Sequence, residues 1–266
     1  MLKRELKKII FSPQYIICVI LLFILLLVGT VGFWADTLDS ESVSMLVHFI
    51  NAWDTFGNVY IVVPLLVTVP VTFLLHDELN SGYIHFSLVR AGKGKYIITK
   101  MITGILAGML MVLMAELLFT IVLVILTPGK INFLDQQQIL GEEPSFYRSL
   151  VTSGKGYVLY IIWVLLAGLY GAVFSAMAVA TSAVAKNKYV ATVVPFLIFL
   201  LVENVIFHFM FIPLVLRAGF EAIFYPYFTL EWMSGIPISL SSVLIWTLAG
   251  TVLFWIVIWC KIKGKI

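Results

Sequence analysis

The sequence predicts an all-α, polytopic membrane protein with six transmembrane helices, an N-terminal amphipathic interfacial helix and both termini in the cytoplasm. Three observations lead to this fold class. The 266 residues are 62% hydrophobic and 12% charged, whereas soluble domains are nearer 25% charged. The mean hydropathy of +1.07 implies more apolar surface than a water-soluble core can bury. The apolar residues also gather in six long runs, and the basic residues gather in alternate connections between them.

Residues 1–13 form the predicted interfacial helix. Apolar and basic residues alternate there with a helical period, and Pro13 ends the pattern. Such a helix lies along the membrane surface, held by its apolar side and by anionic lipid. A simple basic anchor beside the first span fits the same residues.

The six predicted spans each supply the roughly 20 apolar residues that cross a bilayer. They cover residues 15–34, 56–75, 97–126, 157–184, 189–216 and 238–259. Small residues form stripes on two of them and predict close helix packing: Gly104 and Gly108 in the third, and Gly168, Ala172, Ala176 and Ala180 in the fourth.

The distribution of charge orients the spans. The N-terminal segment, the 76–100 connection, the turn at residues 186–188 and the C-terminal tail hold 13 of the 17 Lys and Arg residues. The first outer connection, 35–55, has four acidic residues and no basic one. By the positive-inside rule, both termini and the basic connections are expected in the cytoplasm.

The outer connections differ in character. Residues 127–155 predict an exposed loop with a short helix, whereas 217–237 is aromatic and apolar yet broken by proline and glycine. Broken backbone at membrane depth must be buried in protein or line a cavity. We therefore expect 217–237 to form a re-entrant segment, with an interfacial loop as the alternative. Aromatic residues near the outer boundaries, Trp53 and Tyr160 among them, fit an interfacial belt.

Four polar residues within the predicted spans are candidates for a function: Glu116 in the middle of the third, and Glu203, Asn204 and His208 in the fifth. A charge at mid-bilayer costs about 2.5–3.5 kcal/mol on insertion scales, so such residues face a bundle interior or a cavity. They are candidates for a substrate or proton pathway. Protonated carboxyls that hydrogen-bond to neighbouring helices as packing contacts are the structural alternative.

Signatures of an enzyme are not found in the sequence. The four histidines are scattered and make no metal-ligand spacing, and residues 91–96 lack the spacing of a phosphate-binding loop. We expect no catalytic residue, no metal site and no cofactor in this chain.

The cytoplasmic connection 76–96 contains a more specific pattern. Glu78 is followed at four-residue spacing by Gly82, and Ile84 and Leu88 then predict a short amphipathic helix before Arg90 and further basic residues. A positively charged loop that only sets topology fits the charges equally well. The whole pattern, ending with Lys100 at the start of the third span, resembles the cytoplasmic loop of ABC-2 type permeases, the membrane subunits of one class of ABC exporter.

This resemblance covers the layout of the whole chain, 1–266, as one transmembrane domain, and its specific part is about 25 residues long. Tyr83 stands where the family often has Thr or Ser. The resemblance implies that residues 76–96 are the coupling loop to a separate ATPase, with Glu78, Gly82, Ile84, Leu88 and Arg90 as coupling residues. It also implies ATP-Mg bound by that ATPase, a second permease subunit in a homodimer or heterodimer, surrounding membrane lipids, and no nucleic acid.

The expected function is therefore that of a multi-pass permease in a plasma membrane, most simply a bacterial one, exporting a peptide, lipid or drug-like substrate. Two alternatives remain open. One is a motor-independent channel or proton-linked carrier that uses Glu116 and Glu203. The other is a scaffold or sensor subunit that transports nothing.

Overall fold

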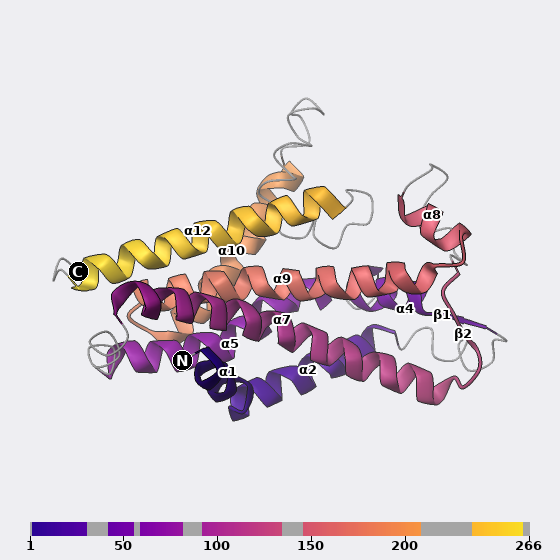
Figure 1. The fold of residues 1–266 in the computed structure, drawn as a ribbon, viewed down its shortest axis with the longest axis horizontal. Coiled ribbons are helices and arrows are strands. Elements are labelled where there is room, and N and C mark those ends of the chain that lie inside the picture. The colour runs from indigo at the N-terminus through magenta and orange to yellow at the C-terminus, as the bar shows by residue number, and fades with distance from the viewer. Residues whose placement is uncertain are drawn as a thin grey trace.

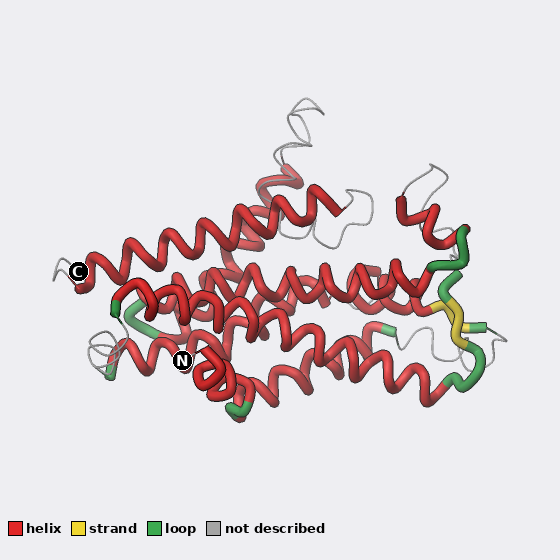
Figure 2. The backbone as a smooth tube through the Cα atoms, viewed as in Figure 1, coloured by secondary structure: helices red, strands yellow, loops and turns green. Residues whose placement is uncertain are grey.

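The computed structural model describes residues 2–30, 42–55, 59–81, 92–134, 146–208 and 236–262. These residues are almost entirely helical (Figure 2). In chain order the elements are α1 (Leu2–Ile10), α2 (Pro13–Gly29), β1 (Val43–Ser44), α4 (Met45–Ile50), the π-helix η1 (Asn51–Thr55), α5 (Val59–Asn80), α7 (Lys93–Leu126), β2 (Ile131–Asn132), α8 (Phe146–Thr152), α9 (Gly156–Val184), α10 (Lys188–His208) and α12 (Ile236–Ile262).

Each predicted span overlaps a helix: α2, α5, α7, α9, α10 and α12. Among the described residues, three helices are long and apolar enough to cross a membrane by length and composition, namely Val59–Leu79 within α5, α7 and α9. α1 and α2 meet the same criterion only as a pair bent by 60°. The chain therefore has candidate membrane-spanning helices, whereas the count of six spans and the orientation of the termini stay predictions.

The N-terminal helix is shorter than predicted because Pro13 begins the next helix instead of ending the first one. α1 stops at Ile10, and the Ser12 side chain accepts a hydrogen bond of 3.3 Å from the Tyr15 N–H. Ser at the N-cap and Pro at the first helical position are both favourable at a helix start. No residue of α1 is buried, although Leu6, Ile9 and Ile10 pack against the core.

α9 is the central helix of the bundle and contacts α5, α7, α10 and α12 (Figure 1). Its most extensive contact is with α7, where a Cβ added to Gly108 would overlap the Ser175 side chain and the Gly171 carbonyl. A Cβ on Gly104 would lie 2.5 Å from Val179. The predicted close packing through small residues is confirmed, and Gly171 and Ser175, outside the predicted stripe, contribute to it.

The described part of the first outer connection, residues 42–55, folds into the bundle. The segment 45–53, which comprises α4 and most of η1, is buried throughout. Just before it, β1 pairs in parallel with β2, with Val43 opposite Ile131 and Ser44 opposite Asn132. This two-residue pairing is a small departure from the all-α prediction. The short helix expected within 127–155 is present as α8.

The bundle has two distinct ends (Figure 1). The charged end holds α1, the end of α5, the start of α7 and the turn between α9 and α10. The strand end holds β1, β2, α4 and α8. The described parts of the 76–96 stretch, residues 76–81 and 92–96, lie at the charged end: α5 continues to Asn80 and α7 begins at Lys93. The predicted short helix at 84–88 lies outside the described residues.

Candidate functional site

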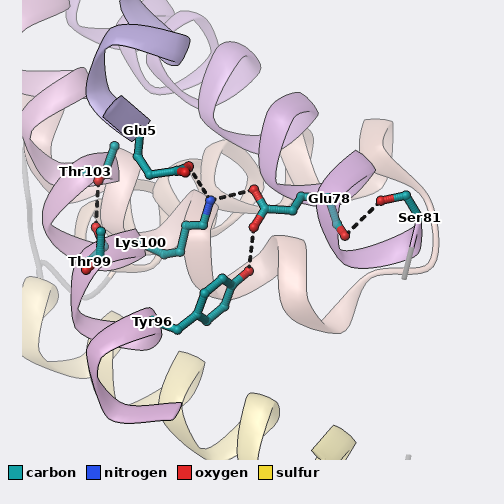
Figure 3. Close-up of polar contacts among 7 residues, drawn as sticks. All are labelled: Glu5, Glu78, Ser81, Tyr96, Thr99, Lys100 and Thr103. Carbon is teal, nitrogen blue, oxygen red and sulfur yellow. Dashed lines mark hydrogen bonds and ion pairs between the residues drawn. The ribbon is translucent and has the colours of Figure 1, made fainter. Parts of the chain in front are cut away.

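A buried ion-pair junction joins three helices at the charged end. The Lys100 Nζ on α7 lies 2.6 Å from Glu78 Oε2 on α5 and 2.6 Å from Glu5 Oε2 on α1 (Figure 3). The exposed fractions of the side chains are 8% for Lys100, 6% for Glu78 and 21% for Glu5. Charged groups this deeply buried are stable only when they are paired and hydrogen-bonded. The junction therefore fixes the relative positions of α1, α5 and α7.

Tyr96 completes the junction. Its hydroxyl donates a 3.1 Å hydrogen bond to Glu78 Oε1, so both carboxylate oxygens of Glu78 accept from α7. Tyr96 and Lys100 are four residues apart and share one face of that helix. The Lys100 Nζ also lies 5.6 Å from the centroid of the Tyr96 ring.

A cavity of about 20 Å³ adjoins the junction, bordered by Glu5, Glu78 and Lys100, by Lys8 of α1 and by Thr103 of α7. The rest of its lining is mainly apolar. A volume of this size holds about one water molecule. The cavity is therefore too small for an organic substrate, and we assign the junction a structural role rather than a binding one.

Asp77, the neighbour of Glu78, points to a different helix. Its carboxylate lies 3.8 Å from Lys188 Nζ at the start of α10, and that ammonium group lies 5.0 Å from the Phe73 ring centroid. The Asp77 side chain is 65% exposed, so this pair contributes little to stability. The acidic pair at the end of α5 thus contacts α7 and α10 directly, and it is linked to α1 through Lys100.

Glu116 occupies a second buried site, nearer the strand end of α7. Its side chain is fully buried, and Oε1 accepts a hydrogen bond from the Trp53 indole N–H of η1. Among the described residues, Glu116 Oε2 has no hydrogen-bond partner. The ion pairs within the same residues involve Lys100 and Lys188, and none of them includes Glu116.

The surroundings of Glu116 are aromatic. Trp53 stacks on Phe49 with a centroid distance of 5.9 Å and meets Tyr170 edge-on at 6.4 Å. Phe49 also contacts Tyr160 of α9 at 6.0 Å. Trp53 and Tyr160 are 2% and 7% exposed, so their assignment to an interfacial belt was wrong. They belong to the interior instead.

His48 lies on α4, the helix directly before η1, and is 4% exposed. Burial lowers the pKa of His48 to about 4, because a charged imidazolium would lose its hydration there. His48 is therefore neutral at pH 7.

Several predicted site residues lie in parts of the chain outside the described residues. Gly82, Ile84, Leu88 and Arg90 lie outside the described residues, as does 209–235, which includes most of the predicted re-entrant segment. The backbone of Glu203, Asn204 and His208 belongs to α10, but their side chains also lie outside the description.

The sequence analysis did not identify the partners of Glu78 and Glu116. Glu5 is the one acidic residue of the basic first helix, and Lys100 lies inside the predicted third span. A lysine within a span requires a partner, and this was the available signal. No group of three or more His, Cys, Asp or Glu that could hold a metal ion occurs within the described part of the chain.

Comparisons with known proteins identify no relative: no protein-family model, no curated protein and no solved structure matches this chain.

Proposed function

We propose that this chain is the permease subunit of an ATP-driven ABC exporter in a plasma membrane, where a separate ATPase drives export of a peptide, lipid or drug-like substrate. The observation that carries the proposal is the buried junction of Glu78, Lys100 and Glu5. Glu78 is also the first residue of the pattern that resembles the coupling loop of ABC-2 type permeases. The resemblance and the junction thus converge on one end of the bundle.

The junction supports the proposal because it links the helices to which an ATPase would apply force. The connection at residues 82–91 runs directly into α5 on one side and α7 on the other. The Lys100–Glu78 pair holds those two helices together, and Glu5 adds α1. A displacement imposed on the connection by an ATPase therefore moves three helices as one unit, instead of bending one of them locally.

The remaining parts of the mechanism follow from the resemblance. ATP-Mg is bound by the partner ATPase, and this chain supplies no catalytic residue. Two permease subunits pair as a homodimer or heterodimer, with both termini in the cytoplasm. Substrate leaves between them, past the segment at 217–237.

The test is a mild-detergent pull-down of the tagged chain from its native membrane, with identification of co-purifying proteins and an ATPase assay. Glu78→Ala and Gly82→Asp are compared with Asp77→Ala, which removes a neighbouring but largely exposed carboxylate. We expect a nucleotide-binding subunit that Glu78→Ala and Gly82→Asp release or uncouple, while Asp77→Ala retains it. Normal export by both of the first two variants would disprove the coupling role.

The Glu116 site favours a second candidate function, a motor-independent channel or proton-linked carrier. A buried carboxyl with one oxygen lacking a partner among the described residues is the kind of group that proton-linked carriers use. This candidate predicts flux through the purified chain alone in liposomes under a proton gradient. Flux that appears only after an ATPase is added would exclude it.

A further inference from the structure

The protonation state of Glu116 follows from its contacts. Among the described residues, the fully buried Glu116 carboxyl has one N–H donor and no cation, so it lacks most of the stabilisation that a charge needs in an apolar interior. Glu78 shows the contrast, since it accepts from both an ammonium and a hydroxyl group. Glu116 is therefore neutral in this arrangement and carries a proton.

The neighbouring hydroxyl groups do not relieve a negative charge on Glu116. The Thr120 hydroxyl donates its single proton to the Glu116 backbone carbonyl at 2.8 Å. The contact of 2.7 Å between Thr120 Oγ1 and the Tyr160 hydroxyl must then be donated by Tyr160. Tyr160 therefore donates its hydroxyl proton to Thr120 and has no other proton to donate to the carboxylate.

Other elements packed against α7 supply no cation to the site within the described residues. η1 contributes Trp53, which is uncharged, and the Asp54 side chain lies outside the description. α4 contributes His48, which is neutral at pH 7. α2 contributes Tyr15, whose hydroxyl is bonded 3.1 Å from the Ala107 carbonyl oxygen, more than two turns away along α7. α5 and α9 also contribute Tyr60 and Tyr170, and neither of these side chains is a cation.

We propose that Glu116 is a proton-binding site, and that the bound proton holds the segment 45–55, comprising α4 and η1, against α7 and α9. The ligand is a single proton taken up from water, which converts the Glu116 carboxylate to a carboxylic acid. When the proton leaves, a charge is created in an apolar site. That charge is stabilised only if water enters, which requires Trp53 and its segment to move away.

Two features of the segment 45–55 fit this role. Trp53 is its direct link to Glu116, so the link is broken or made by one hydrogen bond. Trp53 also sits on a π-helix, a rare form that occurs mostly as single turns and frequently at functional sites.

This inference is independent of the proposed function, because it requires neither an ATPase nor net proton flux. An exporter with a proton-held outer segment and a scaffold with the same segment would both fulfil it. Failure of the ATPase pull-down leaves it untouched, and failure of the experiments below leaves the coupling proposal untouched.

The first experiment measures the proton directly by infrared difference spectroscopy of the purified chain in lipid. We expect a C=O stretch of a protonated carboxylic acid at neutral pH that is absent in Glu116→Gln and retained in Glu78→Gln. Trp53→Phe provides a second test that keeps the acid: losing the indole donor should shift the band to higher frequency. A neutral-pH spectrum with no band that depends on Glu116 would overturn the proposal.

The second experiment measures the segment by hydrogen–deuterium exchange of residues 45–55, comparing the chain with Glu116→Gln at each pH. Comparison at equal pH cancels the intrinsic exchange rate and any effect of His48. The quantity compared is the fraction of molecules with the segment open, in the unmodified chain relative to Glu116→Gln. In the pH range where Glu116 is ionised when exposed and protonated when buried, linkage predicts that this ratio rises up to about tenfold per pH unit. A ratio that stays constant from pH 6 to pH 9 would refute the link between the proton and the segment.

Discussion

Glu78 and Glu116 are both buried acids of one helical bundle, yet the protein accommodates them in opposite ways. Glu78 keeps its charge, because Lys100 and Tyr96 saturate both carboxylate oxygens. Glu116 receives one indole N–H and no cation among the described residues. The first arrangement connects helices through charge, whereas the second is stable only without charge.

The difference corresponds to depth along α7. Lys100 lies near the start of the helix, and Glu116 lies about 24 Å further along it at 1.5 Å per residue. At the charged end the Glu5 side chain is 21% exposed, so the junction borders the surface of the bundle. Glu116 is fully buried, and neutralising the acid with a proton is the least costly solution there. The charge state of a buried acid is thus set by its partners rather than by burial alone.

The largest effect is expected for Lys100→Met, which removes the cation and leaves Glu5 and Glu78 facing each other. Removing one partner of a buried ion pair costs about 3–5 kcal/mol. Thermal and denaturant unfolding in detergent should show this loss. Lys95→Met, an exposed position on the same helix, should change stability by less than about 0.5 kcal/mol.

A neutralising combination sharpens this prediction. Adding Glu5→Gln and Glu78→Gln to Lys100→Met removes the unpaired charges and should recover most of the lost stability. If Lys100→Met and Lys95→Met behaved alike, the junction would not be an energetic link between the helices.

A smaller loss of stability is expected at low pH, and it comes from His48 at the strand end. The folded-state pKa of His48 is about 4, and that of an exposed histidine is about 6.5. Between these values the unfolded chain binds a proton that the folded chain does not, so stability falls as the pH falls. At pH 5 the loss is about 2 kcal/mol relative to pH 7. Unfolding measured at both pH values should show it, and His48→Leu should remove it; an equal acid loss in both proteins would contradict the assignment.

The helices could be predicted from the sequence because their ends are marked locally. The fourth span, predicted at 157–184, is observed at Gly156–Val184, and the third ends at Leu126 as expected, just before Thr127, Pro128 and Gly129. The start of the third was placed four residues late. Lys93 and Lys95 are polar and exposed, and they form an extra turn that apolar length does not reveal.

The pairing of the acids could not be predicted in the same way. Glu116 required a partner by its position in a span, but Trp53 is 63 residues away in sequence. Its connection looked like an acidic outer loop, and an aromatic residue near a boundary fits a membrane interface equally well. Long-range contacts of this kind depend on how the segment 45–55 folds back, which periodicity does not encode.

The smallest effect is expected for Glu116→Gln, and it separates the two acids most clearly. Glutamine has the shape of a protonated glutamate, and its carbonyl can still accept from Trp53. At pH 7 the change in unfolding free energy should therefore stay below about 1 kcal/mol, whereas Glu78→Gln should lose about 2 kcal/mol by weakening charge-assisted hydrogen bonds. The same unfolding assay measures both variants. Equal losses would contradict a neutral Glu116, because a large loss on removal of the charge is expected of an ionised, paired carboxylate.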